Sequence, residues 1–419
     1  MMPRRSRLNA WPIVASAMGL LFLAFAARGA EIPPNPLTQY KERAKKLIPG
    51  GAQDWIQLSD FCQQNLLWTE QEEALRKALS INPGHAEARA LLGERKFGSA
   101  WKPILDAVVE EVKTQRAKGL EYYGTQWMKP EQKKVFLSAD RKTAGWDFEH
   151  RIDLPHVQVY STESFEFTRV AAELGESAGL AYWRFYEKTW RMGGVPPLKL
   201  YLVPTKEAFA SLTKQVARQS FGGNVCGYYD LGVKILFACS QSGKEYCLGT
   251  IVHEMIHALD DRVSAVYPNL PAWFGEGHGE YFNYGRRGLA VVPGKIHVDK
   301  SSPLPAILSG AADAPGLRDL MGRTNSTIRD GRLYLLAWSL VHCLYHGEGG
   351  KYRDKSLKYL STLKTKKFSI DDFEAAVEKL DTLEPLVTKH IKSVMLPAVD
   401  ASRKNDRFVT DALAGLMVK

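Results

Sequence analysis

The segment from Thr250 to Tyr281 constrains this chain more than any other stretch of its sequence. It contains His253-Glu254-Met255-Ile256-His257, with apolar residues at helical spacing around it. Residues four apart share one face of a helix, with Cβ atoms roughly 5–6 Å apart, so two imidazoles at this spacing can bind one metal ion at about 2.0–2.1 Å. Glu254 is one position further round, where its carboxylate can act as a general base on a water at the metal. The pattern predicts a helix that carries two ligands and the base of a catalytic metal site.

A catalytic zinc site takes three protein ligands and leaves a fourth position open. After His257 and a spacer of eighteen residues comes Glu276, in the segment Pro271-Ala272-Trp273-Phe274-Gly275-Glu276-Gly277. Together the two motifs resemble those of the gluzincin metallopeptidases. With the Glu280-Tyr281 that follows, the second motif resembles the peptidase MA-like families, whose members are often uncharacterised. The resemblance covers roughly residues 150–398, and its specific part is residues 250–284.

The resemblance implies an α+β fold of the zincin type with two lobes. A small mixed sheet and the active-site helix form one lobe, and helices form the other. His253, His257 and Glu276 are then the ligands of one Zn²⁺, and Glu254 is the general base. Similar enzymes use a tyrosine from the lower lobe to donate a hydrogen bond to the oxyanion, and Tyr334 is our first choice for it.

Other polar residues around the motifs have weaker assignments. Glu280 lies one helical turn beyond Glu276 and is expected to accept the outer N–H of a zinc histidine. Asp260 and Asp261 are the alternatives for that contact. His278 is two residues from Glu276, on a different helix face, and is not expected to be a ligand. His342 and His346 are also four apart, but no Glu follows His342, so a second metal site is not expected.

The function that we expect is hydrolysis of peptide bonds in a peptide or protein substrate, with endo- or exo-cleavage open. A catalytically idle peptidase fold that binds partners and a zinc hydrolase of non-protein amides or cell-wall peptides are the alternatives. Gly175-Glu176-Ser177-Ala178-Gly179 matches a nucleophile elbow, but no strand leads into it, so a helix contact is the better interpretation.

The first 30 residues have the three parts of a secretory signal: arginines, an apolar run and small residues before Ala30. We expect an exported protein, periplasmic or extracellular. The alternative is an uncleaved membrane anchor, because about 17 apolar residues is borderline for crossing a bilayer. The formal charge of +10 includes four arginines of this segment. The mild charge that remains does not favour nucleic-acid binding.

Residues 36–98 follow as a helical region that resembles a tetratricopeptide repeat. Only about one and a half units are present, whereas three or more are normally needed for a free-standing array. We therefore expect a helical cap packed against another part of the protein, and a groove for a protein partner is the alternative. Two aromatic-Gly-x-x-Trp phrases begin at Phe97 and Tyr123 and indicate a linker anchored by tryptophans over residues 99–150.

The metallopeptidase-like domain is expected over residues 151–398. Alternating segments predict strands at 156–161, 198–203 and 233–238, with a long helix over 162–192. Val233–Ala238 is the candidate edge strand beside the cleft. Residues 333–345 form a strongly apolar helix, and residues 399–419 form a tail. The chain has five cysteines: Cys62, Cys226, Cys239, Cys247 and Cys343. Two interpretations are open, a disulfide bridge among the middle three or buried free thiols.

Overall fold

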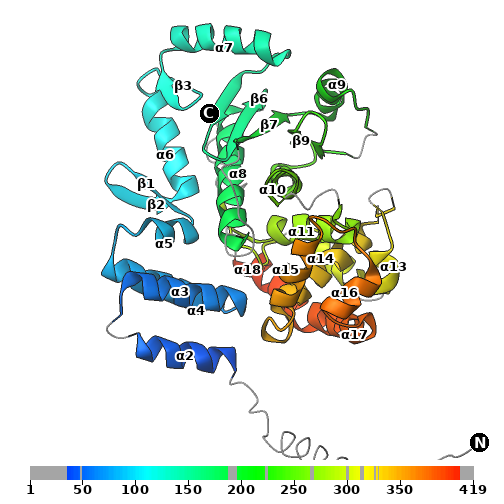
Figure 1. Cartoon of the computed structure of the whole chain (residues 1–419). Coiled ribbons are helices and arrows are strands. Elements are labelled where there is room, and N and C mark those ends of the chain that lie inside the picture. Colours follow the sequence, from blue (N-terminus) through cyan, green and yellow to red (C-terminus); the bar gives the residue numbers. More distant parts are fainter. Residues whose placement is uncertain are drawn as a thin grey trace, which may run out of the picture.

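A computed structural model describes residues 35–47, 50–186, 196–221, 225–264, 269–298, 302–311, 316–324, 327–328 and 330–405. The protein is α+β: over these ranges helices predominate, and the strands form one five-stranded sheet and three short hairpins (Figure 1). The expected export segment, residues 1–30, lies outside the described residues. In the part that is described, no helix combines the length and the apolar character needed to cross a bilayer.

The N-terminal region is a set of helices with a core of its own, at one end of the molecule in Figure 1. α3 and α4 pack side by side, and Trp55, Leu75 and Ala78 meet between them. The helices of this region are α2 (Pro36–Lys46), α3 (Ala52–Gln64), α4 (Trp68–Ile81) and α5 (Ala86–Leu91).

The two aromatic-Gly-x-x-Trp phrases form two tight hairpins. Gly98 and Gly124 take φ values of +59° and +62° at the turns, a backbone conformation that favours glycine. The segment 99–150 is not an extended connection, because side chains such as Val108 and Phe148 enter the two large cores. The elements between residues 94 and 144 are β1 (Glu94–Phe97), β2 (Ala100–Pro103), α6 (Ile104–Arg116), β3 (Glu121–Tyr123), β4 (Gln126–Met128) and α7 (Pro130–Ala144).

The five-stranded sheet has the order β5-β6-β7-β9-β8, with β6, β7 and β9 parallel and both outer strands antiparallel. Alternate residues enter different cores: Leu200 and Leu202 face α8 and α10, whereas Tyr201 and Val203 face α9. Burial on both faces explains why β9 is apolar throughout. The strands are β5 (His150–Asp153), β6 (Val157–Ser161), β7 (Leu198–Val203), β8 (Gly227–Asp230) and β9 (Ile235–Cys239), and the helices between them are α8 (Phe165–Tyr186) and α9 (Lys206–Ala217).

The prediction that Val233–Ala238 lies at the edge of the sheet is wrong. Most of this segment forms β9, which is enclosed between β7 and β8, and β8 is the edge. β8 begins at Gly227 and pairs with β9 through a short hairpin. The structure also adds β5 and α9, which the sequence patterns did not indicate.

The helix predicted around the first motif is α10 (Lys244–Leu259), which continues into one π-helical turn, η1 (Asp260–Ser264). The second motif lies on α11 (Ala272–Asn283), and α11 packs against both α10 and α14. A short hairpin, β10 (Arg286–Arg287) and β11 (Ala290–Val291), packs against α8, where Val291 N–H donates to Ser177 Oγ at 2.8 Å. Ser177 is therefore at a helix contact, as interpreted from the sequence.

The rest of the described chain is helical (Figure 1). The predicted apolar helix is α14, which is buried along most of its length. The expected tail begins as helix, with Val399 fully buried, and residues 406–419 lie outside the described residues. The elements are α12 (Leu304–Ala311), α13 (Leu317–Met321), α14 (Gly331–His346), η3 (Gly347–Gly349), α15 (Arg353–Thr362), α16 (Ile370–Ala376), α17 (Leu380–His390), η4 (Ile391–Met395) and α18 (Leu396–Asn405).

All five cysteines are buried free thiols, so the bridge considered among Cys226, Cys239 and Cys247 is not formed in this structure. Of the two interpretations, the buried-thiol one describes the structure. The cysteines act as small apolar groups in the cores.

Candidate metal centre

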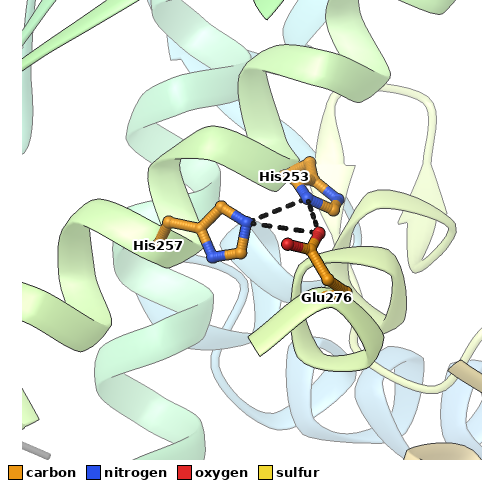
Figure 2. A group of neighbouring side chains, drawn as sticks. All are labelled: His253, His257 and Glu276. Carbon is orange, nitrogen blue, oxygen red and sulfur yellow. Dashed lines mark hydrogen bonds and ion pairs between the residues drawn. The ribbon is translucent and has the colours of Figure 1, made fainter. Parts of the chain in front are cut away.

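Three side chains from the two motifs converge on one point between α10 and α11 (Figure 2). His253 Nε2 lies 3.0 Å from His257 Nε2 and 3.2 Å from Glu276 Oε2, and His257 Nε2 lies 3.7 Å from the same oxygen. His253 is buried, and the other two side chains are mostly covered. Among the residues that the structure describes, this is the one group of three or more His, Cys, Asp or Glu side chains with ligand atoms this close together.

The separations suit a four-coordinate metal ion. A tetrahedral zinc with bonds of about 2.0–2.1 Å holds its ligand atoms about 3.3 Å apart. The three observed separations, 3.0, 3.2 and 3.7 Å, bracket that value. Two imidazole nitrogens and one carboxylate oxygen are also a ligand set that zinc accepts. The residues therefore fit a zinc ion.

The electrostatics of the group favour positive charge at this point. Burial acts to lower the pKa of His253, but the carboxylates of Glu280 and Glu276 outweigh it and hold the pKa well above its usual range. Burial acts to raise the pKa of Glu276, yet its hydrogen bonds to the two imidazoles keep that pKa well below the ordinary value. A cluster that stabilises a proton in this way also suits a metal cation.

Glu280 and Gly279 fix the orientation of His253. Glu280 Oε1 lies 3.3 Å from the outer nitrogen, Nδ1, of His253, and Asn283 Nδ2 donates to the other Glu280 oxygen at 2.7 Å. A Cβ atom at Gly279 would lie only 2.7 Å from the His253 ring. The glycine lets the imidazole rest on the backbone of α11. Gly279 is not among the site residues expected from the sequence, although the repeated glycines at 275, 277 and 279 are a visible signal.

Glu254 follows His253 directly on α10 and contacts the edge strand. The backbone N–H of Tyr229 in β8 donates to Glu254 Oε2 at 2.9 Å. The same tyrosine is anchored at its hydroxyl, which donates to Asp261 Oδ2 at 2.7 Å. The edge strand therefore orients the carboxylate of Glu254. No sequence pattern identifies a backbone donor of this kind.

Tyr334 comes from the first turn of α14 and lies near the same group. Its ring centroid is 6.4 Å from that of His253. Burial, together with the charges of Glu276 and Glu254, raises the pKa of Tyr334 above its ordinary value. The hydroxyl therefore stays protonated at neutral pH and is able to donate a hydrogen bond.

The remaining residues considered in the sequence are not part of this group and have other partners. His278 bonds Asp260, and Asp261 pairs with Lys234 as well as Tyr229. His342 and His346 contact other groups: His342 Nδ1 lies 2.7 Å from His390 Nε2, and His346 Nδ1 lies 3.0 Å from the carbonyl oxygen of Gln64.

No family model fits the chain, and no curated protein matches its sequence.

Proposed function

We propose that this protein is a zinc-dependent peptidase in which Glu254 is the general base. The observation that carries the proposal is the convergence of His253, His257 and Glu276, whose ligand atoms are 3.0–3.7 Å apart. Zinc at this point would polarise the scissile carbonyl and lower the pKa of water toward about 7.

The residues of the chain supply the proton transfers and the orientation. Glu254 takes a proton from the attacking water and delivers it to the nitrogen of the leaving amine as the carbon–nitrogen bond breaks. Tyr229 N–H holds the carboxylate of Glu254 in place, and Glu280 orients His253. The protonated hydroxyl of Tyr334 donates a hydrogen bond to the oxyanion.

The proposal also includes the class of fold, the role of the N-terminal helices and export from the cell. We propose a zincin-type fold with two lobes and membership of the gluzincin, peptidase MA-like group. The mixed sheet above α10 and the helices after α11 support it. Residues 36–98 are proposed as a tetratricopeptide-like helical cap, supported by the separate core of α3 and α4, with a groove for a protein partner as the alternative. The composition of residues 1–30 supports export.

Replacement of the base tests the mechanism. We expect Glu254→Gln to bind as much zinc as the parent chain but to cleave a mixed peptide library at least about 10²-fold more slowly, because the proton acceptor is lost. Cleavage is followed by mass spectrometry, and zinc by elemental analysis. Glu131→Gln on α7 is the control and should cleave like the parent.

Two outcomes would count against the proposal. Cleavage by Glu254→Gln at the parent rate would show that this carboxylate is not the base. A parent chain that binds zinc and cleaves no peptide would favour the alternative of a catalytically idle binding protein.

A further inference from the structure

A second polar cluster lies in the buried core, close in sequence to two of the three residues of the proposed metal site. Asp260 follows His257 by three residues, and His278 follows Glu276 by two. Asp260 Oδ2 and His278 Nδ1 are 2.9 Å apart, and both side chains have 0% exposure. The hydrogen bond therefore joins α11 to the end of α10, a short distance along the chain from a ligand on each helix.

The cluster is closed by two tyrosines of α8. Tyr182 Oη donates to Asp260 Oδ1 at 2.7 Å, and Tyr186 Oη lies 2.5 Å from His278 Nε2. Both carboxylate oxygens and both ring nitrogens thus have a partner. The ring of Phe274 stacks on that of His278 with centroids 5.0 Å apart. The cluster thus joins α8 and α11 to the end of α10.

The contribution of such a cluster to folding stability does not by itself explain its presence. A buried carboxylate and imidazole lose their hydration, and apolar side chains of similar volume would often pack as well or better. A hydrogen bond, unlike apolar packing, also fixes direction and separation. Asp260 is in addition the first residue of the π-helical turn η1, where the backbone departs from α-helical spacing. The polar pair therefore fits a role in alignment.

We propose that the Asp260–His278 hydrogen bond positions Glu276 against His253 and His257 and thereby sets the affinity of the site for zinc. The inference rests on the proposed metal site. Ligands of a metal must be held within about 0.5 Å of their productive places. The bond acts on α11 two residues from Glu276 and on α10 three residues from His257, so it controls the separation of the two ligand-bearing helices. Asp260 and His278 are positioning residues, not ligands.

Zinc affinity of folded variants tests the proposal. The affinity is measured by competition with a chromophoric chelator, on protein that circular dichroism shows to be folded. We expect Asp260→Ala to bind zinc about 10–100-fold more weakly than the parent, as loss of an orienting contact does in other sites. Asp260→Asn should stay within a few fold of the parent, because the amide can still hydrogen-bond both partners if His278 takes its other tautomer.

A second variant separates alignment from stability. Replacing the whole cluster by apolar groups of similar size avoids an unpaired buried charge, so the chain should fold while the alignment is lost. We expect this variant also to bind zinc at least about 10-fold more weakly. It combines Tyr182→Phe, Tyr186→Phe, Asp260→Leu and His278→Phe. The control is Glu245→Leu with Arg286→Met, a buried pair 3.4 Å apart that also joins α10 to a later element. The control should bind zinc like the parent.

The outcomes are distinct. Parent-like affinity in Asp260→Ala and in the apolar variant would overturn the inference and leave the proposed metal site intact. An Asp260→Asn chain as weak as Asp260→Ala would show that the charge, not the hydrogen bond, matters, and would also overturn it. If the parent chain binds no zinc, the proposed function fails and the inference fails with it.

Discussion

At the scale of single residues, the proposed site depends on a glycine, Gly279, which has no side chain to collide with His253. His253 is held between Glu280 on one side and the backbone of α11 at Gly279 on the other. Glycine inside a helix costs about 0.5–1 kcal/mol relative to alanine. Residue 279 is a glycine despite this destabilisation, because the imidazole of His253 leaves no room for a Cβ atom there.

Gly279→Ala should therefore damage the site. Its Cβ would be 2.7 Å from the ring of His253, so the imidazole or α11 must move. We expect a loss of about 1–3 kcal/mol in the free energy of unfolding, as is usual for overpacking, and weaker zinc binding. Urea unfolding and chelator competition measure the two effects.

Gly275→Ala is the matched control on the same helix. There the nearest atom, His257 Cε1, would be 3.9 Å from the new Cβ, which is an ordinary contact. The change should be neutral or slightly stabilising, because alanine favours helix over glycine. Equal effects of the two substitutions would contradict the role given to Gly279.

At the scale of elements, the edge strand β8 and the helix α10 are in close contact. β8 crosses α10 at Gly227, where a Cβ would lie 2.0 Å from Thr250 Cγ2. Two residues later, Tyr229 N–H reaches Glu254. The closeness of β8 to α10 is thus what places the backbone donor on the proposed base.

Gly227→Ala should push β8 away from α10. We expect a fall in melting temperature and a loss of peptidase activity larger than the fall in folded protein, because the Tyr229–Glu254 hydrogen bond lengthens. Thr250→Ser in the same chain removes Cγ2 and should restore most of both. If the second change restores neither, the steric explanation is wrong.

The sequence predicted some elements well and others not. The strand at 198–203 and the helices of the two motifs were visible, because their apolar residues recur at one clear period. β8 was missed because its four residues begin with a glycine, which usually marks a turn. The three proposed ligands could be selected from motif spacing, whereas Tyr229 N–H and the Asp260–His278 pair depend on tertiary packing that no local pattern encodes.

At the scale of the whole molecule, a buried histidine cluster connects distant parts of the chain. His342 of α14 bonds His390 of α17, and His346 bonds the Gln64 carbonyl of the N-terminal helices. Burial lowers the pKa of His390 to about 4 and that of His346 to about 3, and it lowers the pKa of His342 as well. These side chains are neutral in the folded chain at neutral pH.

Stability should therefore fall in acid. The unfolded chain binds protons at these histidines below about pH 6.5, whereas the folded chain does not until about pH 4 or lower. The stabilisation is fully present above pH 6.5 and is lost as the pH falls toward 4. Each histidine then contributes a loss of roughly 1.4 kcal/mol per pH unit.

A single variant isolates this effect from the proposed metal ligands. His390→Gln lacks one titrating group, so its free energy of unfolding should depend less steeply on pH between 6.5 and 4.5, by roughly 1 kcal/mol per unit. Urea unfolding of the metal-free chains at several pH values gives both slopes. Identical slopes would contradict a neutral buried His390.

Metal analysis of the purified chain is the most direct test of the central proposal that His253, His257 and Glu276 hold one ion. We expect about one zinc per chain, removable by a chelator and restored by zinc alone. Glu276→Ala, checked as folded by circular dichroism, should retain far less. A folded parent chain that binds no zinc, or a Glu276→Ala chain that binds it as tightly as the parent, would contradict the proposal.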